Sequence, residues 1–395
     1  MRTPPFIATL ALLAALLARP ARAEVTPSVV VDVGSGYVIA AEAAERPWFP
    51  ASLAKLMTLY LAFEAVEAGQ LGLDETLTAS AHAAAQPDTS LRLASGDTLT
   101  VEEAIEATAT HSANDAAVVL AERLAGSEYA FAQRMTATAA ALGLRGTQFR
   151  NASGLPHPEQ VTTARDMALL ALALLRDFPR HYHYFAGRGF AFHGRAVSAT
   201  NGLLDAYEGA DGLKTGFTCD SGYNLVASAM RDGRRLVAVL LGASSSQARN
   251  GAVAKLLDAG FAAPLGEAPK LSDPADGPGA AEAPPHVLPA AECAAGAGVA
   301  GGRLPGWGLV FGAFPKRAEA LAAVEAARHA LRPVTRAGRP VALMRQREGA
   351  KLYSALLVGL RQDDAGKACK QLWSLNEYCL VLNPEVLNNP QSMWR

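Results

Sequence analysis

The chain has 395 residues with a formal net charge of −1, and 50% of its residues are hydrophobic. This length and composition are typical of a globular protein with two or three domains, and they exclude a disordered chain. The near balance of basic and acidic residues argues against a nucleic-acid partner.

Residues 1–23 have the pattern of a secretory signal peptide. Arg2 precedes an apolar run from Phe6 to Leu17, and Ala21-Arg22-Ala23 stands before Glu24. This pattern predicts cleavage after Ala23. The apolar run is too short to span a bilayer comfortably, and no later segment approaches the roughly 20 apolar residues of a spanning helix. We therefore expect a mature protein outside the cytoplasm, in the periplasm, with no integral membrane span.

Residues 24–262 read as the first folded domain. Two β-rich runs around Gly34-Ser35-Gly36 predict a hairpin. A helix is predicted after Pro50, because apolar residues follow it at helical spacing until Gly69. A capping box from Thr100 to Glu103 predicts the start of a further helical region.

The period of the apolar residues changes near Gly212. Helical patterns continue to about residue 180, whereas three β-rich runs follow Gly212, the last two joined by Asp232-Gly233. They predict an antiparallel meander, closed by a helix from about Gln247 to Gly260.

The C-terminal part is predicted to hold a linker and a second domain. Residues 263–304 are rich in Ala, Pro and Gly, as expected for a linker. Residues 305–384 repeat a β-α-β pattern, which predicts a small duplicated βαβ domain with its helices on one face of a sheet. Residues 385–395 are a short tail. Cys369 and Cys379 would join a helix end to the next strand, so we expect them to form a disulfide, whereas Cys219 and Cys293 carry no expectation.

Three short motifs contain residues that are suited to catalysis. Ser52 and Lys55 are three residues apart at the start of a predicted helix, so their side chains share a face. Such a lysine can take a proton only if apolar neighbours or a nearby cation depress its pKa. By itself this spacing occurs by chance, so two ordinary polar residues on a helix remain an alternative. Ser112-Ala113-Asn114 and Lys214-Thr215-Gly216 follow in this order, which makes coincidence improbable.

Together, the three motifs resemble the active-site elements of the penicillin-binding protein and serine β-lactamase superfamily. The stretches FPASLAKLMT, HSANDA, NASGLPHPEQVTTARDMALLA and DGLKTGFT look like the low-molecular-mass D-alanyl-D-alanine carboxypeptidases of the type-5 group. The resemblance implies an α/β (α+β) transpeptidase-like fold, an antiparallel sheet with helices. It also implies a serine-type hydrolase without cofactor or metal, which acts on peptidoglycan stem peptides and which β-lactams inhibit covalently.

The resemblance also implies a role for each motif residue. Ser52 is the nucleophile, Lys55 its base, and Ser112 a proton relay to the leaving amine. The substrate-binding residues are Asn114, Lys214, Thr215, Gly216 and Phe217. Backbone N–H groups of Ser52 and Phe217 would form an oxyanion hole, in which a single donor is typically worth about 2.7 to 4 kcal/mol.

Two positions depart from the family pattern. Ala113 stands where many relatives have glycine, and Phe217 where several have histidine. Residues 305–384 resemble SPOR domains, which bind septal peptidoglycan glycan strands, although Val310 replaces the usual glutamine. This second resemblance implies enrichment of the enzyme at the division septum.

Several alternatives stay open at this stage. The same motifs would serve a D,D-endopeptidase that cuts cross-links, and the chain could instead be a septal wall-binding protein with minor catalysis. A β-lactamase would need a deacylating glutamate, but the surroundings of Glu159 lack the pattern of that enzyme group. His181 and His183 are expected to be structural rather than metal ligands. Arg249 would bind a carboxylate or make a salt bridge at a helix start.

Overall fold

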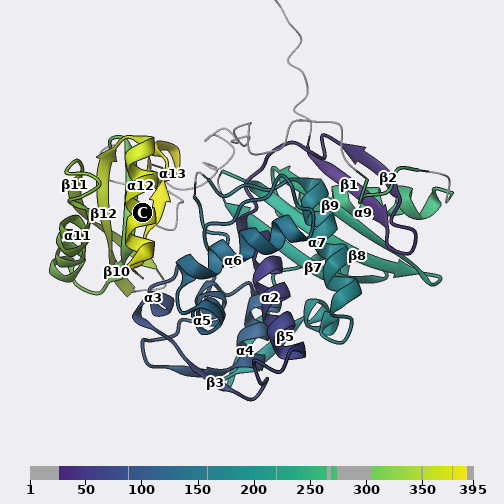
Figure 1. Ribbon diagram of the computed structural model, residues 1–395, viewed down its shortest axis with the longest axis horizontal. Coiled ribbons are helices and arrows are strands. Elements are labelled where there is room, and N and C mark those ends of the chain that lie inside the picture. Colours follow the sequence, from purple (N-terminus) through teal and green to yellow (C-terminus); the bar gives the residue numbers. More distant parts are fainter. Residues whose placement is uncertain are drawn as a thin grey trace, which may run out of the picture.

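The protein has two bodies side by side, a larger one formed by the first part of the chain and a smaller one formed by its C-terminal part (Figure 1). This computed structural model describes residues 26–87, 89–157, 159–218, 220–264, 268–273, 304–347, 350–375 and 377–388. The predicted signal peptide, residues 274–303 of the predicted linker, Cys219, Cys293 and the end of the tail lie outside these residues.

A five-stranded antiparallel sheet forms one half of the larger body, with the strand order β2-β1-β9-β8-β7. The β1–β2 pair is the predicted hairpin, and β7, β8 and β9 are the predicted meander, so both predictions are confirmed. β7 lies at an edge of the sheet. The strands are β1 (Ser28–Asp32), β2 (Val38–Glu42), β7 (Ala210–Thr218), β8 (Gly222–Arg231) and β9 (Arg234–Ala243).

Helices cover both faces of this sheet. Successive strand residues point to opposite faces, so each strand packs against helices on both sides. Leu236 of β9 packs in the cluster that contains α9 (Ser246–Ala262). The next residue, Val237, packs in the larger cluster that contains α7 (Ala164–Asp177). Both faces are therefore dry, as the continuous apolar runs of β8 and β9 require.

The other half of this body is helical and surrounds α2 (Lys55–Glu67), of which ten residues are buried. The predicted capping box is present at Thr100 and Glu103, at the start of α4. The remaining elements are η1 (Ala51–Ala54), β3 (Thr76–Thr78), α3 (Ala81–Ala84), β4 (Thr98–Thr100), α4 (Val101–Glu106), η2 (Ala107–His111), α5 (Asn114–Ala125), α6 (Glu128–Ala141), η3 (Tyr182–Ala186), β5 (Gly189–Phe192), β6 (Arg195–Ser198) and α8 (Leu203–Ala206).

Residues 268–273 belong to the larger body, although composition assigns them to the linker. Leu271 is 2% exposed within the main core, and its N–H donates to the Gly36 carbonyl oxygen at 2.9 Å. Arg165 donates to the carbonyl oxygen of Leu271. A single buried leucine in a polar, Pro-rich stretch gives no periodic signal, which is why the composition misplaced this segment.

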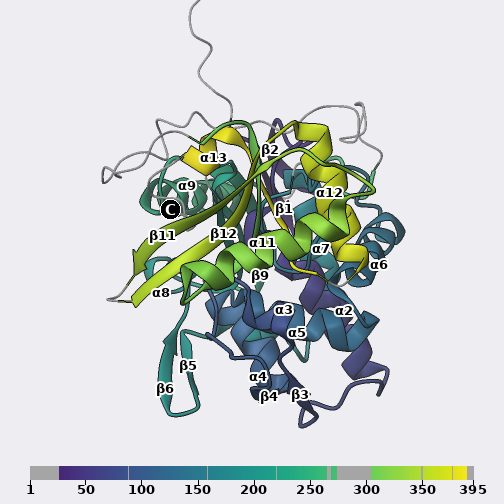
Figure 2. The same ribbon diagram turned by 90° about the vertical axis from the view of Figure 1, so that its left-hand side faces the viewer.

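The smaller body is a four-stranded antiparallel sheet with the order β11-β12-β10-β13. Two β-α-β units build it, with α11 and α12 on one face (Figure 2). The predicted tail begins as a short helix, α13, whose Val386 and Leu387 are buried against the opposite face. The elements are β10 (Trp307–Phe314), α11 (Arg317–Leu331), β11 (Arg339–Arg347), β12 (Ala350–Leu360), α12 (Gln362–Ser374), β13 (Leu380–Leu382) and α13 (Pro384–Asn388).

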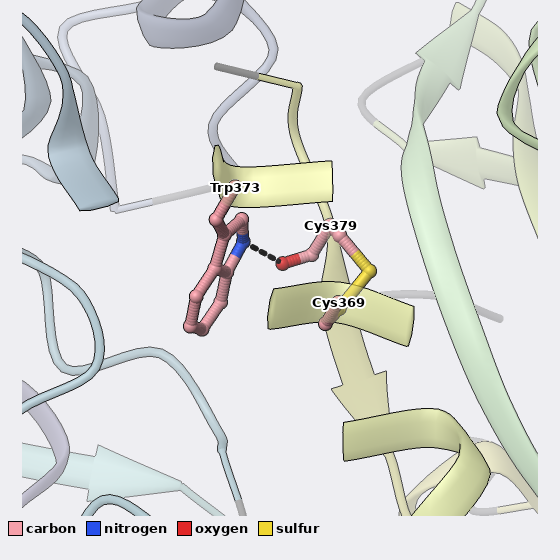
Figure 3. Close-up of a disulfide and its surroundings, with 3 residues drawn as sticks. All are labelled: Cys369, Trp373 and Cys379. Carbon is pink, nitrogen blue, oxygen red and sulfur yellow. Dashed lines mark hydrogen bonds between the residues drawn. A yellow bond between two sulfur atoms is a disulfide. The ribbon is translucent and has the colours of Figure 1, made fainter. Parts of the chain in front are cut away.

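The Cys369–Cys379 disulfide joins α12 to the segment before β13, as predicted (Figure 3). The Trp373 indole N–H donates to the Cys379 carbonyl oxygen at 2.8 Å and closes the same turn of chain. Across the described ranges, no helix combines the length and apolar character needed to cross a membrane.

Candidate active site

Lys55 lies at the centre of the site, and its side chain is completely buried. Its Nζ donates to the Asn114 Oδ1 and to the Ser153 carbonyl oxygen, both at 2.6 Å, and contacts the Ser52 Oγ at 3.2 Å. A lysine Nζ carries three hydrogens when charged, so these three oxygens satisfy it fully. The site therefore fixes the position of Nζ beside the serine hydroxyl.

The surroundings favour the neutral amine of Lys55. Burial is the largest cause that lowers the pKa of Lys55 well below its ordinary value, and the charge of Lys214 adds to it. The carboxylates of Asp115 and Glu128 act in the opposite direction. A neutral amine in contact with the Ser52 hydroxyl is able to take its proton.

Ser52 sits on the short helical turn η1, directly before α2, on a constrained backbone. Its neighbour Ala51 has a φ of +49°, a left-handed conformation that is costly for a non-glycine residue. Gly216 of β7 passes so close that a Cβ there would stand 3.2 Å from the Ser52 backbone nitrogen. Glycine thus allows the strand edge to approach the serine, and it brings the Phe217 N–H into the same region.

Ser112 stands at the end of the π-helical turn η2, two residues before Asn114, which contacts Lys55. Its φ of +67° is left-handed, and its Oγ is buried without a hydrogen-bond partner in the described part of the chain. A buried hydroxyl without a partner is costly unless a ligand completes it. The hydroxyl of Ser112 is thus available to a bound substrate, while Asn114 is held by the Pro87 carbonyl oxygen at 2.8 Å.

The third motif supplies cationic and hydroxyl groups from β7. Burial and the charge of Arg249 lower the pKa of Lys214 to about 7. The Thr215 hydroxyl donates to the Thr200 Oγ1 at 3.1 Å. Phe217 is 45% exposed and stacks on Tyr223 at 4.2 Å between ring centroids. The structure thus brings all three motifs to one place, with Phe217 at its open rim.

Other candidates have different surroundings. His181 stacks on Phe63 and contacts the Glu67 carboxylate at 3.0 Å, so it is part of the helical core. Glu159 pairs with Arg150 on the surface. Among the described residues, no group of three His, Cys, Asp or Glu could hold a metal ion.

Arg249 makes no salt bridge at the start of α9 within the described chain. Its guanidinium donates to the Asn250 Oδ1 at 2.9 and 3.0 Å, and only 5% of the residue is exposed. Burial lowers its pKa to about 10. A buried guanidinium beside Lys214 is suited to pairing with a carboxylate of a ligand.

The sequence motifs did not indicate the segment that supplies the Ser153 carbonyl oxygen to Lys55. The next residue, Gly154, has a φ of +83°, and a Cβ there would overlap the Ala51 carbonyl oxygen. Both belong to the NASGLPHP stretch, which supported the family resemblance without a role for any of its residues. A backbone acceptor leaves no signature in a side-chain motif, so only the conspicuous Ser-Gly pair could have indicated it.

The comparison with known families now decides the class of protein. A model of the D-alanyl-D-alanine carboxypeptidase family, peptidase family S11, matches residues 16–245. The chain belongs to this family. The match includes Ser52, Ser112 and Lys214 and ends before the C-terminal body, about which it is silent.

Individual relatives agree with this assignment. D-alanyl-D-alanine carboxypeptidase DacC of Escherichia coli is 38% identical over 240 residues, which cover 59% of this chain and 60% of the relative. The chain therefore spans about three fifths of the length of this curated relative. Penicillin binding protein 6B from Escherichia coli matches with a TM-score of 0.57 and 33% identity, over 62% of this chain and 80% of that chain.

A second similar structure contains a β-lactam. It is penicillin-binding protein D2 from Listeria monocytogenes in its ampicillin-bound form, with a TM-score of 0.54 and 33% identity. The match covers 60% of this chain and 97% of that chain. The larger body thus has the penicillin-binding-protein fold that the sequence predicted.

Removal of the Lys214 charge should raise the pKa of Lys55. We expect Lys214→Gln to move the acidic limb of Ser52 acylation by a β-lactam to higher pH, because Lys55 reacts only when neutral. The maximal rate should also fall, since Lys214 attracts the carboxylate of the reagent. Rates of covalent adduct formation between pH 5 and pH 10 measure both effects. An acidic limb that stays in place would contradict the electrostatic coupling.

Proposed function

We propose that this protein is a serine-type D-alanyl-D-alanine carboxypeptidase that removes the terminal D-alanine from peptidoglycan pentapeptide stems. The observation that carries the proposal is the contact between the Ser52 Oγ and the Nζ of Lys55, which is buried and whose pKa is lowered. The family assignment supports it, because the curated relative DacC has this name. The chain needs no metal or organic cofactor for this chemistry.

In the proposed acylation, Lys55 takes the hydroxyl proton of Ser52 while the oxygen attacks the carbonyl carbon between the two D-alanines. Backbone N–H groups of Ser52 and Phe217 hold the oxyanion. Collapse of this intermediate breaks the peptide bond, and Ser112 passes a proton to the leaving amine. Water then attacks the ester, and the shortened stem leaves with Ser52 restored.

The substrate carboxylate would lie against β7. Lys214 and Arg249 supply positive charge there, and the Thr215 hydroxyl can donate a hydrogen bond to the terminal carboxylate. Because β7 is an edge strand, the stem peptide can also align with its free backbone groups. The same site would accept the carboxylate of a β-lactam, which makes these drugs expected covalent inhibitors.

Ser52→Ala should abolish D-alanine release from a pentapeptide stem, because no other nucleophile takes its place. The mature wild-type chain should release D-alanine and gain one penicillin adduct on Ser52, as mass spectrometry can show. Release of D-alanine by Ser52→Ala would contradict the mechanism. An adduct on Ser52 without release from the stem would favour the alternative, a D,D-endopeptidase, which a cross-linked stem dimer tests in the same assay.

A basic cavity beside the site is suited to the rest of the stem. It has a volume of about 400 Å³, and its lining includes Arg92, His111 and Arg195. His111 directly precedes the proposed relay Ser112, and the Thr89 carbonyl of this lining accepts the Asn114 N–H at 2.7 Å. The lining residues that the structure describes include no carboxylate, so the cavity favours an anionic group.

Arg195→Ala should raise the KM for a pentapeptide stem that carries a side-chain carboxylate by about three- to fivefold, since exposed ion pairs are worth up to ~1 kcal/mol. The KM for the corresponding amidated stem and the acylation rate with penicillin should change little. Arg188→Ala, which removes an exposed arginine that pairs with Asp205 instead, is the matched control. Equal effects on the acidic and the amidated stem would argue against an anionic subsite.

The C-terminal body is proposed to be a SPOR-like domain that binds glycan strands and enriches the enzyme at the septum. Its double β-α-β architecture is compatible with this role. A fluorescent fusion exported to the periplasm should concentrate at the division site, and deletion of residues 305–384 should make it uniform. A full-length fusion that is already uniform around the envelope would refute septal targeting.

A further inference from the structure

The C-terminal body contacts the larger body through one continuous face, which we call the docking face. It consists of the end of α12, residues 377–383 and α13. Trp373 lies on His157 with ring centroids 4.9 Å apart, and Tyr378 on His82 at 5.6 Å. The Asn383 side-chain amide donates to the Asp220 Oδ1 at 2.7 Å. Figure 1 shows α12 and α13 on the side of the C-terminal body that is turned toward the larger body, where α12 contacts α6.

The docking face is dry at its centre. Trp373 and Tyr378 are 6% and 8% exposed, and the two histidines that they contact are exposed by no more than 8%. Leu155 of the larger body packs within the apolar cluster of the C-terminal sheet and α13. Burial of this kind is typical of a permanent interface rather than of a tethered module that moves independently.

The disulfide shapes this face. It fixes Cys379 to α12, and the indole of Trp373 donates to the Cys379 carbonyl oxygen (Figure 3). Tyr378 is the residue before Cys379. Both interface aromatics are therefore held by one covalent link.

His82, which Tyr378 contacts, is connected to Lys55 through a chain of contacts. The His82 Nε2 and the Glu128 Oε2 are 2.6 Å apart, and the other Glu128 oxygen accepts the Ala152 N–H at 2.9 Å. The next residue, Ser153, offers the carbonyl oxygen that accepts from the Lys55 Nζ. Four consecutive contacts thus link a C-terminal aromatic ring to the proposed catalytic base.

His157 ties the second aromatic to the same loop. Its Nδ1 accepts the Glu159 N–H at 3.0 Å, and its carbonyl accepts the Gln160 N–H. The Gln160 side chain in turn holds the Asn151 N–H. Burial lowers the pKa of His157 to about 3, so the ring that contacts Trp373 is neutral near pH 7.

Electrostatic interactions also connect His82 at the docking face with Lys55. Burial lowers the pKa of His82, but the hydrogen bond and charge of Glu128 outweigh it and leave this pKa raised. Glu128 also raises the pKa of Lys55, as does Asp115, whereas burial and Lys214 lower it. A displaced His82 would leave the Glu128 carboxylate uncompensated beside Lys55.

We propose that the docking face is part of the catalytic unit, because Tyr378 and Trp373, by packing on His82 and His157, position the 151–157 loop that holds Lys55. These aromatics are positioning residues, since they act through the loop and touch no substrate. The inference rests on the proposed function where it concerns catalysis. Its structural part, that docking orders the loop, stands independently.

The test compares the full mature chain with Tyr378→Ala and Trp373→Ala by two measurements. Hydrogen–deuterium exchange over residues 150–157 reports the order of the loop and needs no activity. The rate constant for Ser52 acylation by penicillin, measured across pH, reports the position and pKa of Lys55. Tyr378→Phe retains the ring, and Val324→Ala disturbs the same C-terminal core from α11, which packs on β10, β11, β12 and α12.

We expect exchange over residues 150–157 to accelerate at least tenfold in both interface variants. Acylation should slow about tenfold, and its acidic limb should move to higher pH, because water that reaches Lys55 and an uncompensated Glu128 both raise the pKa of Lys55. Tyr378→Phe should restore both readouts. Val324→Ala should match the wild type in the loop even if the C-terminal body melts at a lower temperature.

Unchanged exchange over residues 150–157 in the two alanine variants would overturn the proposal, whatever the activity. Equal acceleration by Val324→Ala would also overturn it, since the effect would then follow general destabilisation. If the wild-type chain is not acylated at all, the proposed function fails, and the exchange data alone decide whether docking orders the loop.

Discussion

The burial of Lys55 is the constraint on which the site depends. An amine with no access to water must have its polar hydrogens accepted by protein groups, and three separate segments supply the acceptors: η1, the start of α5 and the 151–157 loop. Their convergence fixes Ser52 and Asn114 relative to one another. Burial and the charge of Lys214 make the neutral amine the favoured form, so the enclosure that fixes the position of Lys55 also suits it to act as a base.

The edge strand β7 meets a second requirement of the site, because it supplies positive charge without raising the pKa of Lys55. Burial and the charge of Arg249 lower the pKa of Lys214 to about 7. When Lys214 is charged it can attract an anion, and the same charge lowers the pKa of Lys55. Gly216 permits the strand to approach Ser52 closely. Ser112, whose Oγ has no hydrogen-bond partner among the residues that the structure describes, stands at the end of η2 in the helical half. The sheet and the helical half of the larger body thus meet at the site.

The sequence predicts the side-chain part of this arrangement well, because periodicity and motif spacing are local. The spacing of Ser52 and Lys55, the capping box at Thr100 and the turn at Asp232-Gly233 each follow from neighbouring residues alone. Long-range contacts escaped prediction. The Ser153 carbonyl is a backbone group that any residue could provide, and Leu271 is a single apolar residue in a polar stretch. The docking of Tyr378 on His82 joins positions almost 300 residues apart, which no window of sequence connects.

The position of the disulfide relates the two bodies to the compartment in which the protein is expected to work. Structural disulfides form in oxidising compartments, outside the cytoplasm. Cys379 carries both the covalent link and the carbonyl oxygen that accepts from Trp373, so the disulfide lies directly beside the docking face. If this face orders the 151–157 loop as proposed, the order around Lys55 depends on a bond that forms outside the cytoplasm.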